Sequence, residues 1–540
     1  MLLRTQNDNL INTTSLSWRA IQMKSFIDHA NNALKGTIFI GSSIGNIDDN
    51  GEIWNIKLSN RTYQVYAHSL LMVYYLTEAY NDTLEEKYIK LAQEYLLSWM
   101  ETEHKSKYRW HEYPTLSRLK YTLFFINSYK ENELPSNTLK EFLIKHLNFL
   151  IDDKNYKKNN HGIMMDNSLV SSIEMLPEEL DYIKPGIIKK VIERSREAIT
   201  RDFSEKGLHL ENSPDYHRLT IKWLQNIEKK LEAKNATIGA SYIKKLETAK
   251  TLEPMIVMPN NRYPIYGDSS DGRFHGDKIF KDLIDKEAGR AVFHNEDLKS
   301  QLTFIAGYGR KGHKHYDDLS FVFHDGTEVI FNDSGKYNYE KNNPIRKHLI
   351  SPLAHNSLSV YRENYVISQL QNIREKIYIS KYEKNPFYKL IQGVNDSYNG
   401  ICLKRTLLFF NDNSILILDQ FSSDNVNTVA VNFNLGLDIS VDKISRSEYH
   451  LKGKHEYILK SHISPFTSVL LEDTQNTMCK ISNKFGKTES NTRILLRLKT
   501  KSSAFLTTIE PKPSHLEVLN FENNVLDLVF KGQELSIEIS

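Results

Sequence analysis

The segment PMIVMPNNRYPIYGDSSDG, residues 254–272, separates two parts of the chain with different hydrophobic patterns. Its prolines, glycines, asparagines and aspartates disfavour both helix and strand, so we interpret it as a connector. Before it, apolar residues recur at helical spacing; after it, short β-rich runs alternate with turn signals. The sequence therefore predicts a helical part followed by a β part, with a boundary near residue 265.

Helical periodicity is clearest in Tyr66–Tyr80 and Leu84–Met100, where apolar side chains recur every three or four residues. Between them, Asn81-Asp82-Thr83 indicates a turn and an N-cap. Similar patterns recur along the first half, at Leu116–Tyr129, Leu139–Leu150, Ser168–Leu176, Ile187–Thr200 and Leu219–Ala233. Serial helices with short polar connections predict an all-α array.

The second half contains a clear hairpin signal. Arg405–Phe410 and Ser414–Asp419 are β-rich and are joined by Asn411-Asp412-Asn413. Further β-rich runs occur at Val429–Leu435, His455–Ser461, Arg493–Leu498 and Val525–Phe530. Regular strands with turn signals predict a sandwich or a barrel.

Length and charge limit the classes of protein. The 540 residues are too many for one core, so more than one domain is expected. Hydrophobic residues make up 40% and charged residues 25%, which is typical of a globular protein. The 70 basic and 67 acidic residues give a net charge of +3, so no broad basic field exists and nucleic acid is not an expected partner.

The N-terminal residues, the apolar runs and the cysteines bear on the location of the protein. Met1–Ser15 lacks the basic and apolar regions of a signal peptide, and no apolar run approaches the ~18 residues that span a bilayer. The only cysteines, Cys402 and Cys479, cannot form a disulfide framework. We therefore expect a cytoplasmic protein without a membrane span, with a periplasmic or secreted protein as the alternative. The oligomeric state is left open.

The strongest local motif is Gly312-His313-Lys314-His315-Tyr316-Asp317-Asp318-Leu319-Ser320-Phe321. If it is a strand, His313, His315 and Asp317 point to one face, because side chains alternate. Two imidazoles on one face suit a metal site or an acid–base pair. The alternative is a polar rim without chemistry.

Two further motifs lie between short β-rich runs: Asn332-Asp333-Ser334-Gly335 and Ala354-His355-Asn356-Ser357. Two histidines and a carboxylate form a familiar zinc ligand set. The alternative is ordinary turn chemistry, for which these residues are equally suited.

Two polar breaks interrupt the helical half, at Asn159-Asn160-His161-Gly162 and at Glu211-Asn212-Ser213-Pro214-Asp215-Tyr216-His217. Functional residues often collect in such connections, although helix capping explains the same residues. Arg118 is a candidate clamp for a carboxylate or sulfate, since guanidinium pairs with both. Its alternative role is a solvated helix charge.

Together these stretches resemble the heparinase II/III-like polysaccharide lyases over about residues 60–540. The family pattern His-Gly-His-Ala-Asp-x-Leu-Ser-Phe is similar to residues 313–321, with Lys314 and Tyr316 in place of small residues. Its Asp-Pro-Gly followed by tyrosines is similar to residues 333–339, with Ser334 in place of proline and Lys336 as an added charge. Other matching elements are Asn160-His161, Ser213–His217, Pro264–Ser269 and His355-Asn356.

The resemblance implies a multidomain α+β fold with the active cleft between its two main domains. An N-terminal extension, 1–55, would precede an incomplete α/α toroid, 56–265. A C-terminal antiparallel β-sandwich, 266–540, would follow. The implied activity is cleavage of an acidic, uronate-containing polysaccharide or oligosaccharide by β-elimination, without an organic cofactor.

The resemblance also implies roles for individual residues. The catalytic residues would be Asn160, His161, Tyr216 and His313. A structural Zn²⁺ would be held by His315, Asp333 and His355. Residues that we expect to contact the substrate are Arg118, His217, Tyr337 and Tyr339.

These residue types suit an elimination. Removing the C5 hydrogen of a uronate adds negative charge to its carboxylate, which hydrogen bonds from Asn160 and a protonated His161 would neutralise. Tyr216 has an ordinary pKa of about 10. Cations supplied by His217, Arg218 or His313 would favour its phenolate as the base. The phenol or His313 would then protonate the leaving glycosidic oxygen.

Two other classes remain open. A glycoside hydrolase needs a pair of carboxylates, and Glu211, Asp215 and Asp268 are available. A catalytically inactive glycan-binding protein of surface-polysaccharide metabolism is the third class.

Overall fold

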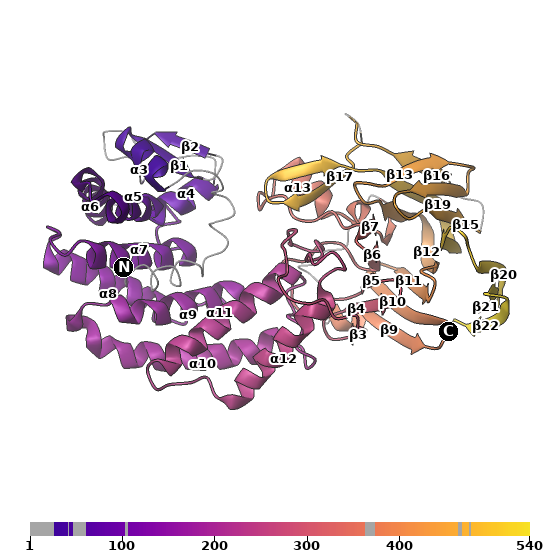
Figure 1. Ribbon diagram of the computed structural model, residues 1–540, viewed down its shortest axis with the longest axis horizontal. Helices are drawn as coiled ribbons and strands as arrows, with labels where there is room; N and C mark the ends of the chain where they lie inside the picture. Colours follow the sequence, from indigo (N-terminus) through magenta and orange to yellow (C-terminus); the bar gives the residue numbers. More distant parts are fainter. Residues whose placement is uncertain are drawn as a thin grey trace. The chain divides into compact units, whose positions relative to one another are not determined.

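The computed structural model describes residues 26–40, 43–46, 54, 61–102, 106–361, 373–462, 467–474 and 477–539. The chain forms two compact units (Figure 1). The helical unit comprises Met1–Arg201 and Leu219–Leu246, and the sheet unit comprises Asp202–Arg218 and Glu247–Ser540. These units interleave in sequence, whereas the predicted domains, 56–265 and 266–540, are continuous. Most of the predicted extension, 1–55, lies outside the described residues.

The first half of the chain is helical, as predicted. Its elements are α3 (Phe26–Leu34), β1 (Thr37–Ile40), β2 (Ser43–Asn46), α4 (Arg61–His68), α5 (Leu71–Thr83), α6 (Glu86–Glu101), α7 (Glu112–Ser128), α8 (Ser136–Ile151), α9 (Asn160–Ser172), η3 (Ile173–Met175), η4 (Glu178–Ile183), α10 (Lys184–Asp202), α11 (Pro214–Glu232) and α12 (Ala240–Ile256). Within the helical unit, α5 packs against α6 and α7, and α7 packs against α8 and α9.

The predicted helix Tyr66–Tyr80 is two helices. Leu70 adopts a left-handed conformation with φ of 58°, which ends α4 and precedes α5. The predicted turn at 81–83 is also wrong, because α5 continues to Thr83. Leu84, with φ of 59°, closes the helix by donating its N–H to Tyr80 O. Both breaks fall at leucines, one buried (Leu70) and one exposed (Leu84), and no local propensity indicates a left-handed conformation at leucine.

The predicted stripe of α6 is largely buried and confirmed. Its buried side chains are Tyr88, Ile89, Ala92, Tyr95, Leu96 and Trp99. Burying a large apolar side chain contributes about 1.5–3 kcal/mol, which holds a helix that lacks a side-chain N-cap. The buried apolar face therefore positions this helix.

The sheet unit is built from antiparallel strands. They are β3 (Leu283–Asp285), β4 (Arg290–Asn295), β5 (Ser300–Ile305), β6 (Ser320–Asp325), β7 (Glu328–Phe331), β8 (Leu358–Val360), β9 (Ile377–Lys384), β10 (Tyr388–Tyr398), β11 (Ile401–Phe410), β12 (Ile415–Asn434), β13 (Ser440–Lys443), β14 (Glu448–Lys452), β15 (Tyr457–Ser461), β16 (Thr467–Leu471), β17 (Lys480–Lys484), β18 (Lys487–Ser490), β19 (Arg493–Pro511), β20 (Leu516–Glu522), β21 (Val525–Phe530) and β22 (Gln533–Glu538). Three short helices interrupt them, α13 (Pro344–Leu349), η5 (Pro352–Ala354) and α14 (Ile373–Lys376).

Two sheets form a sandwich. The five-stranded sheet has the order β3-β4-β5-β6-β7, and the ten-stranded sheet has the order β13-β14-β15-β19-β12-β11-β10-β9, with β16 beside β19 and β8 beside β12. Phe323 of β6 lies 5.8 Å from the ring of Phe409 on β11 and 5.8 Å from that of Tyr457 on β15. The shared apolar core between these sheets confirms the predicted sandwich.

The predicted hairpin at residues 405–419 is confirmed. β11 and β12 pair up to Phe409 and Ile415, and the turn closes through Phe410 N–H donating to Ser414 O at 2.9 Å. Asn413 takes the left-handed conformation that asparagine tolerates in turns.

The strand predicted for residues 312–321 is wrong in its first part. β6 begins at Ser320, and the preceding residues form a loop. His313 and Leu319 have positive φ angles of 57° and 62°, which a strand cannot contain. Lys314 also forms ion pairs with Asp317 and Asp318, and these three- and four-residue spacings require a turn. The two histidines are therefore not placed by strand alternation.

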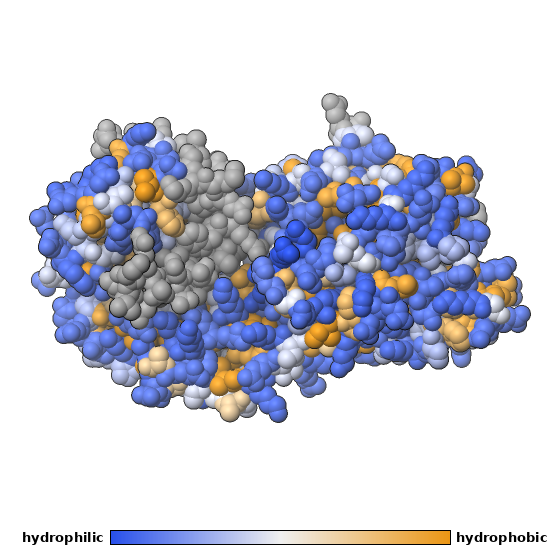
Figure 2. Space-filling model, in the orientation of Figure 1, coloured by the Kyte–Doolittle hydropathy of each residue, from blue (hydrophilic) through white to orange (hydrophobic). Residues whose placement is uncertain are grey.

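Hydrophilic residues cover most of the face drawn in Figure 2, and apolar residues appear there in small scattered groups. Among the described residues, no helix is long and apolar enough to cross a membrane. A polar surface of this kind is typical of a chain whose apolar side chains are used in its cores.

One buried guanidinium connects the two sheets. Arg405 on β11 is fully buried, and its Nε and Nη2 donate to Asp419 Oδ1 at 2.6 Å and Oδ2 at 2.8 Å. Its Nη1 donates to the carbonyl oxygens of Leu319, before β6, and Asn356, before β8. Arg405 therefore fixes two loop ends against the ten-stranded sheet.

We predict that Arg405→Met lowers the free energy of unfolding by about 3–5 kcal/mol, because Asp419 keeps a buried charge without its partner. Urea denaturation followed by circular dichroism measures the change. Lys404→Met is the matched control, since Lys404 is only partly buried, and it should change stability by about 0.5 kcal/mol or less. Equal midpoints for both variants would contradict this role of Arg405.

Buried His324 makes stability depend on pH. It lies on β6, is 1% exposed, and burial with the charge of Lys278 lowers its pKa to about 3. The unfolded chain binds a proton below about pH 6.5 that the folded chain binds only near pH 3, so stability is lost as pH falls. Between pH 7 and pH 5, the native chain should lose about 2 kcal/mol more than His324→Leu.

The control for this prediction is His515→Gln, which removes an exposed histidine. Urea unfolding at each pH should give His515→Gln the same pH dependence as the native chain. Identical pH dependence in His324→Leu and the native chain would refute the prediction.

Candidate active site

Tyr216 lies in the first turn of α11. Ser213 precedes the helix, accepts the N–H of His217 on its carbonyl at 3.0 Å, and its Oγ lies 3.4 Å from Tyr216 N. Pro214 occupies the first helical position, where its missing N–H has no cost. The capping interpretation of this motif therefore holds, and the cap places Tyr216 in the first turn of the helix.

Tyr216 and His313 form a stacked pair in the sheet unit. Their ring centroids are 3.5 Å apart with an angle of 11° between the planes. The Tyr216 hydroxyl lies 2.9 Å from the hydroxyl of Tyr339. Tyr216 is 2% exposed, whereas Tyr339 is 40% exposed. The structure thus brings together three of the predicted residues, with one ring open to solvent.

His313 is held in an uncommon backbone conformation. Its φ is 57°, and Asn212 clamps the preceding residues by donating Nδ2 to Arg310 O at 2.6 Å and to Gly312 O at 2.9 Å. Gly267 passes so close that an added Cβ would lie 2.3 Å from Asn212 O. Backbone strain of this kind at a non-glycine residue is concentrated in functional sites.

Carboxylates flank the His313 ring. Its Nδ1 lies 3.2 Å from Asp268 Oδ2, and its Nε2 lies 3.5 Å from Glu211 Oε2. Burial alone would raise the pKa of Asp268, but hydrogen bonds from His313 and His315 and the charge of Arg346 hold that pKa well below its ordinary value. Asp268 is therefore a carboxylate. From the sequence alone, Asp268 and Glu211 had a chemical role only as candidate carboxylates of a hydrolase.

The expectation that cations favour a Tyr216 phenolate is wrong in this structure. Burial raises the pKa of Tyr216 above its ordinary value, and the charges of Asp268, Asp215 and Glu211 raise it further, although the Tyr339 hydroxyl opposes them. Arg218 instead pairs with Asp215 at 3.3 Å. The Tyr216 phenol is thus held protonated and is suited to donate a proton.

The His217 side chain is buried and makes internal contacts. It is 4% exposed, its Nδ1 accepts the N–H of His209 at 3.2 Å, and its Nε2 lies 3.1 Å from Ala249 O. Burial lowers its pKa to about 4, so it is neutral near pH 7. Its predicted roles in substrate binding and as a nearby cation are therefore corrected to a structural one.

Tyr337 is partly buried on the same segment as Tyr339, and its carbonyl accepts the N–H of Gly486 at 2.7 Å. Its predicted contact with substrate stays a prediction. Tyr339 is better placed for one, because its exposed ring is flanked by Lys336 Nζ and the Arg346 guanidinium, each 5.8 Å from the ring centre.

Asn160 and His161 form a second polar group, in the helical unit. Asn159 caps α9 by accepting the N–H of His161 at 3.0 Å, so the helix starts well before the predicted Ser168. Asn160 is 2% exposed, and its Nδ2 has no hydrogen-bond partner among the described residues. A buried amide donor without a partner is costly and indicates a missing ligand or water.

Glu112 orients His161. Glu112 Oε1 lies 2.9 Å from His161 Nδ1, and the His161 side chain is 38% exposed. Burial would raise the pKa of Glu112, but the hydrogen bond from His161 and the charge of His111 lower it to about 2. The sequence analysis missed this role, because Glu112 and His161 are 49 residues apart and no motif joins them.

Arg118 is not a substrate clamp. It is fully buried in the helical unit, donates to His146 Nε2 at 2.8 Å and to Arg109 O at 2.8 Å, and also bonds His68 O. Its guanidinium lies 3.9 Å from the Trp99 ring centre. The alternative of a solvated charge is equally wrong, since the guanidinium is used to hold helices together.

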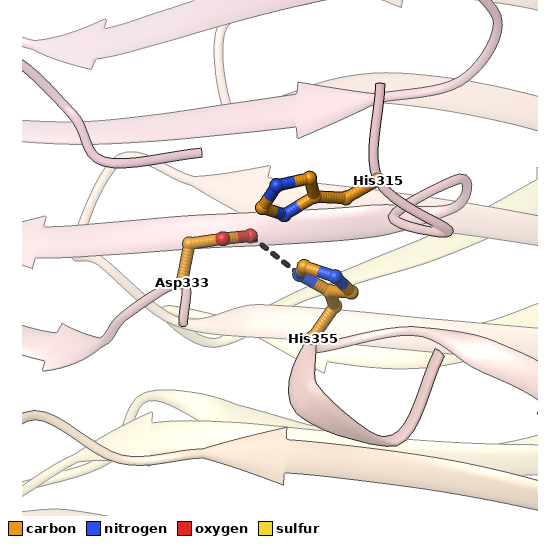
Figure 3. Close-up of side chains that lie close together, drawn as sticks. All are labelled: His315, Asp333 and His355. Atoms are coloured by element: carbon orange, nitrogen blue, oxygen red, sulfur yellow. Dashed lines mark hydrogen bonds and ion pairs between the residues drawn. The ribbon is translucent and has the colours of Figure 1, made fainter. Parts of the chain in front are cut away.

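His315, Asp333 and His355 converge, as Figure 3 shows. All three are buried, and their ligand atoms lie within 4.8 Å of one another. His315 comes from the loop before β6, Asp333 follows β7, and His355 follows η5. The predicted group therefore meets without the strand alternation that had been expected to place His315.

The chemistry of this group fits a metal ion. Asp333 Oδ2 lies 2.9 Å from His355 Nδ1. His315 Nδ1 and His355 Nε2 are buried and have no hydrogen-bond partner in the part of the chain that is described. Buried imidazole nitrogens without partners beside a carboxylate are the donors that zinc prefers. These residues can thus hold a metal ion.

Known proteins resemble the chain in both sequence and fold. The family descriptions "Heparinase II/III N-terminus" and "Heparinase II/III-like, C-terminal" match residues 5–285 and 286–510. No curated protein matches the chain.

Solved structures align over almost the whole chain. A crystal structure of heparinase III aligns with a TM-score of 0.78 and 15% identity, over 96% of this chain and 92% of that chain. A heparinase III gene product with methylated lysines aligns with a TM-score of 0.72 and 15% identity, over 96% of this chain and 92% of that chain. Heparan sulfate lyase HepC from Pedobacter heparinus aligns with a TM-score of 0.65 and 16% identity, over 96% of this chain and 90% of that chain. These likenesses confirm the predicted fold class, an incomplete toroid followed by a β-sandwich.

Since the two family descriptions together span residues 5–510, the chain belongs to the heparinase II/III family and is a polysaccharide lyase, which is a carbon–oxygen lyase.

Proposed function

We propose that the chain cleaves a uronate-containing acidic polysaccharide or oligosaccharide by β-elimination, with Tyr216 and His313 transferring the protons. The observation that supports this most is the stacked Tyr216–His313 pair, whose phenol is hydrogen-bonded to the half-exposed Tyr339. A phenol and an imidazole in contact supply one acid and one base within reach of the same sugar.

The assignment of acid and base follows from the surroundings of each ring. Burial and nearby carboxylates keep the Tyr216 phenol protonated, so Tyr216 donates to the leaving glycosidic oxygen. His313 donates Nδ1–H to Asp268, which leaves Nε2 to accept the C5 proton. The C5–H electron pair forms the C4–C5 double bond as the C4–O bond breaks. The product is an unsaturated uronate, and no water is consumed.

The substrate carboxylate needs neutralising groups as charge develops on it. For this step we keep the predicted roles of Asn160 and His161, which the geometry of the helical unit supports by itself. The Asn160 amide is buried without a partner, and His161 is oriented by a carboxylate while remaining partly exposed. Both features suit groups that bind an anion.

We further propose that His315, Asp333 and His355 hold a structural Zn²⁺. When bound, the ion would connect the loop before β6, the segment after β7 and the turn before β8. An ion in this position would stabilise the loop that carries His313.

We predict that Tyr216→Phe lowers kcat by about 10²–10⁴-fold, because the proton donor is lost, while glycan binding is retained. The assay is a panel of uronate polymers, including heparan sulfate, chondroitin, hyaluronan and alginate, followed by the ultraviolet absorbance of unsaturated products. Tyr182→Phe, at a 69% exposed position, is the matched control and should behave as the native chain does.

The same panel separates the other classes of activity. A hydrolase would produce reducing ends without ultraviolet absorbance, and a binding protein would produce neither. Either result, or normal turnover by Tyr216→Phe, would reject the proposed mechanism.

Zinc should stabilise the chain. We predict one bound zinc per chain, and at about 100-fold excess over Kd the ion should add about 2.7 kcal/mol to the free energy of unfolding. Elemental analysis and thermal unfolding before and after chelation measure both quantities. His355→Ala should lose the bound ion and the effect of zinc, whereas His515→Ala should keep both. Absence of bound metal in the native chain, with no stabilisation by added zinc, would exclude the site.

A further inference from the structure

The carboxylate of Asp268 is shared by two histidines with different tasks. Asp268 is 3% exposed. Its Oδ1 lies 3.0 Å from His315 Nε2 and accepts Arg346 Nη1–H at 2.6 Å. Its Oδ2 lies 3.2 Å from His313 Nδ1. One side chain therefore joins a residue of the candidate metal group to the histidine of the stacked pair.

The backbone holds Asp268 in place independently of these histidine side chains. Its N–H donates to His313 O at 3.2 Å, and its carbonyl accepts Ser213 Oγ–H at 3.2 Å. Gly267 before it has φ of 59° and passes against the Asn212 carbonyl, where a side chain would collide. The backbone thus fixes the position of the Asp268 carboxylate, and both imidazoles contact it there.

Shared hydrogen bonding determines which ring nitrogen carries the proton. His315 Nε2 lies 3.0 Å from Asp268 Oδ1 and 3.3 Å from Arg346 Nη1, which itself donates to Oδ1. A proton on His315 Nε2 satisfies the Asp268 carboxylate and leaves Nδ1 for a metal. On His313, a proton on Nδ1 satisfies Asp268 Oδ2 in the same way, and Nε2, 3.5 Å from Glu211 Oε2, is then the nitrogen that exchanges a proton with substrate. Carboxylates behind ligating histidines fix ring orientation and strengthen metal binding.

We propose that Asp268 is a positioning residue that serves the metal site and proton transfer together, by orienting His315 through Oδ1 and His313 through Oδ2. The half that concerns His313 rests on the proposed lyase function, whereas the half that concerns His315 does not. Loss of this carboxylate therefore weakens metal binding and slows turnover at once, and refilling the metal site does not restore turnover.

The test compares Asp268→Asn with Glu211→Gln in the full chain. In asparagine only one of the two terminal atoms is an acceptor, and the other is an NH₂ donor. The ring that faces the NH₂ group must therefore change its tautomer. Glu211 approaches His313 at 3.5 Å, which makes Glu211→Gln a control for loss of a charge beside His313. The readouts are zinc affinity by chelator competition, kcat and KM at saturating zinc, and ring ¹⁵N spectra of labelled histidines.

We expect Asp268→Asn to weaken zinc binding by about 10–100-fold, as removal of such a carboxylate does. At saturating zinc, kcat should remain lowered by about 10²-fold or more, with KM changed by about threefold or less, because the His313 tautomer is still wrong. Glu211→Gln should bind zinc within about threefold of the native chain. Native zinc affinity or native kcat in a folded Asp268→Asn protein would overturn the proposal.

Two measurements keep the test decisive if Asp268→Asn misfolds or if the chain is not a lyase. In the native chain, the ring spectra should show His313 protonated on Nδ1 and His315 protonated on Nε2, and the opposite assignment for either ring overturns the proposal without any variant. If the native chain eliminates no uronate polymer, the proposed function fails. The zinc affinities and ring spectra then still decide the role of Asp268.

Discussion

The loop that carries His313 and His315 depends on the burial of one ammonium group. The Lys314 side chain is fully shielded and forms ion pairs with Asp317 and with Asp318, the latter at 3.1 Å. A buried cation without partners would cost several kcal/mol, so these pairs require the segment to turn back on itself. The turn sends the side chains of His313 and His315 to different oxygens of Asp268. Both the stacked pair and the candidate metal group follow from this arrangement.

The same ion pairs explain a departure from the family pattern. Lys314 stands where the family pattern has a glycine, so it adds a charged side chain to the loop. Its ammonium is consumed by internal carboxylates, and the charge of Lys314 also holds the pKa of Asp317 below its ordinary value against the effect of burial.

Sequence patterns predicted those features that local burial controls. The apolar period of α6 and the β11–β12 hairpin were predictable because each repeats the geometry of its own backbone. The loop at His313 was not, since its backbone is held by Asn212, about one hundred residues earlier in the chain, as well as by the Lys314 ion pairs. Arg118 was misjudged for a related reason, because its burial is decided by His146 on another helix. Family motifs named the candidate residues, but only tertiary contacts show that Asp268 meets His313 and that Glu112 meets His161.

Each of the two units contains a histidine in contact with a buried carboxylate. Glu112 orients His161 in the helical unit, and Asp268 orients His313 in the sheet unit. In each pair the carboxylate is buried and kept ionised, with the pKa of Glu112 lowered to about 2 and that of Asp268 well below its ordinary value. The imidazole is the more exposed partner, at 38% for His161 and 13% for His313. Fixing the proton on one nitrogen leaves the other nitrogen with a defined role toward a ligand. In the proposed reaction, His161 helps to neutralise the substrate carboxylate and His313 moves a proton, and two separate carboxylates orient the two rings independently.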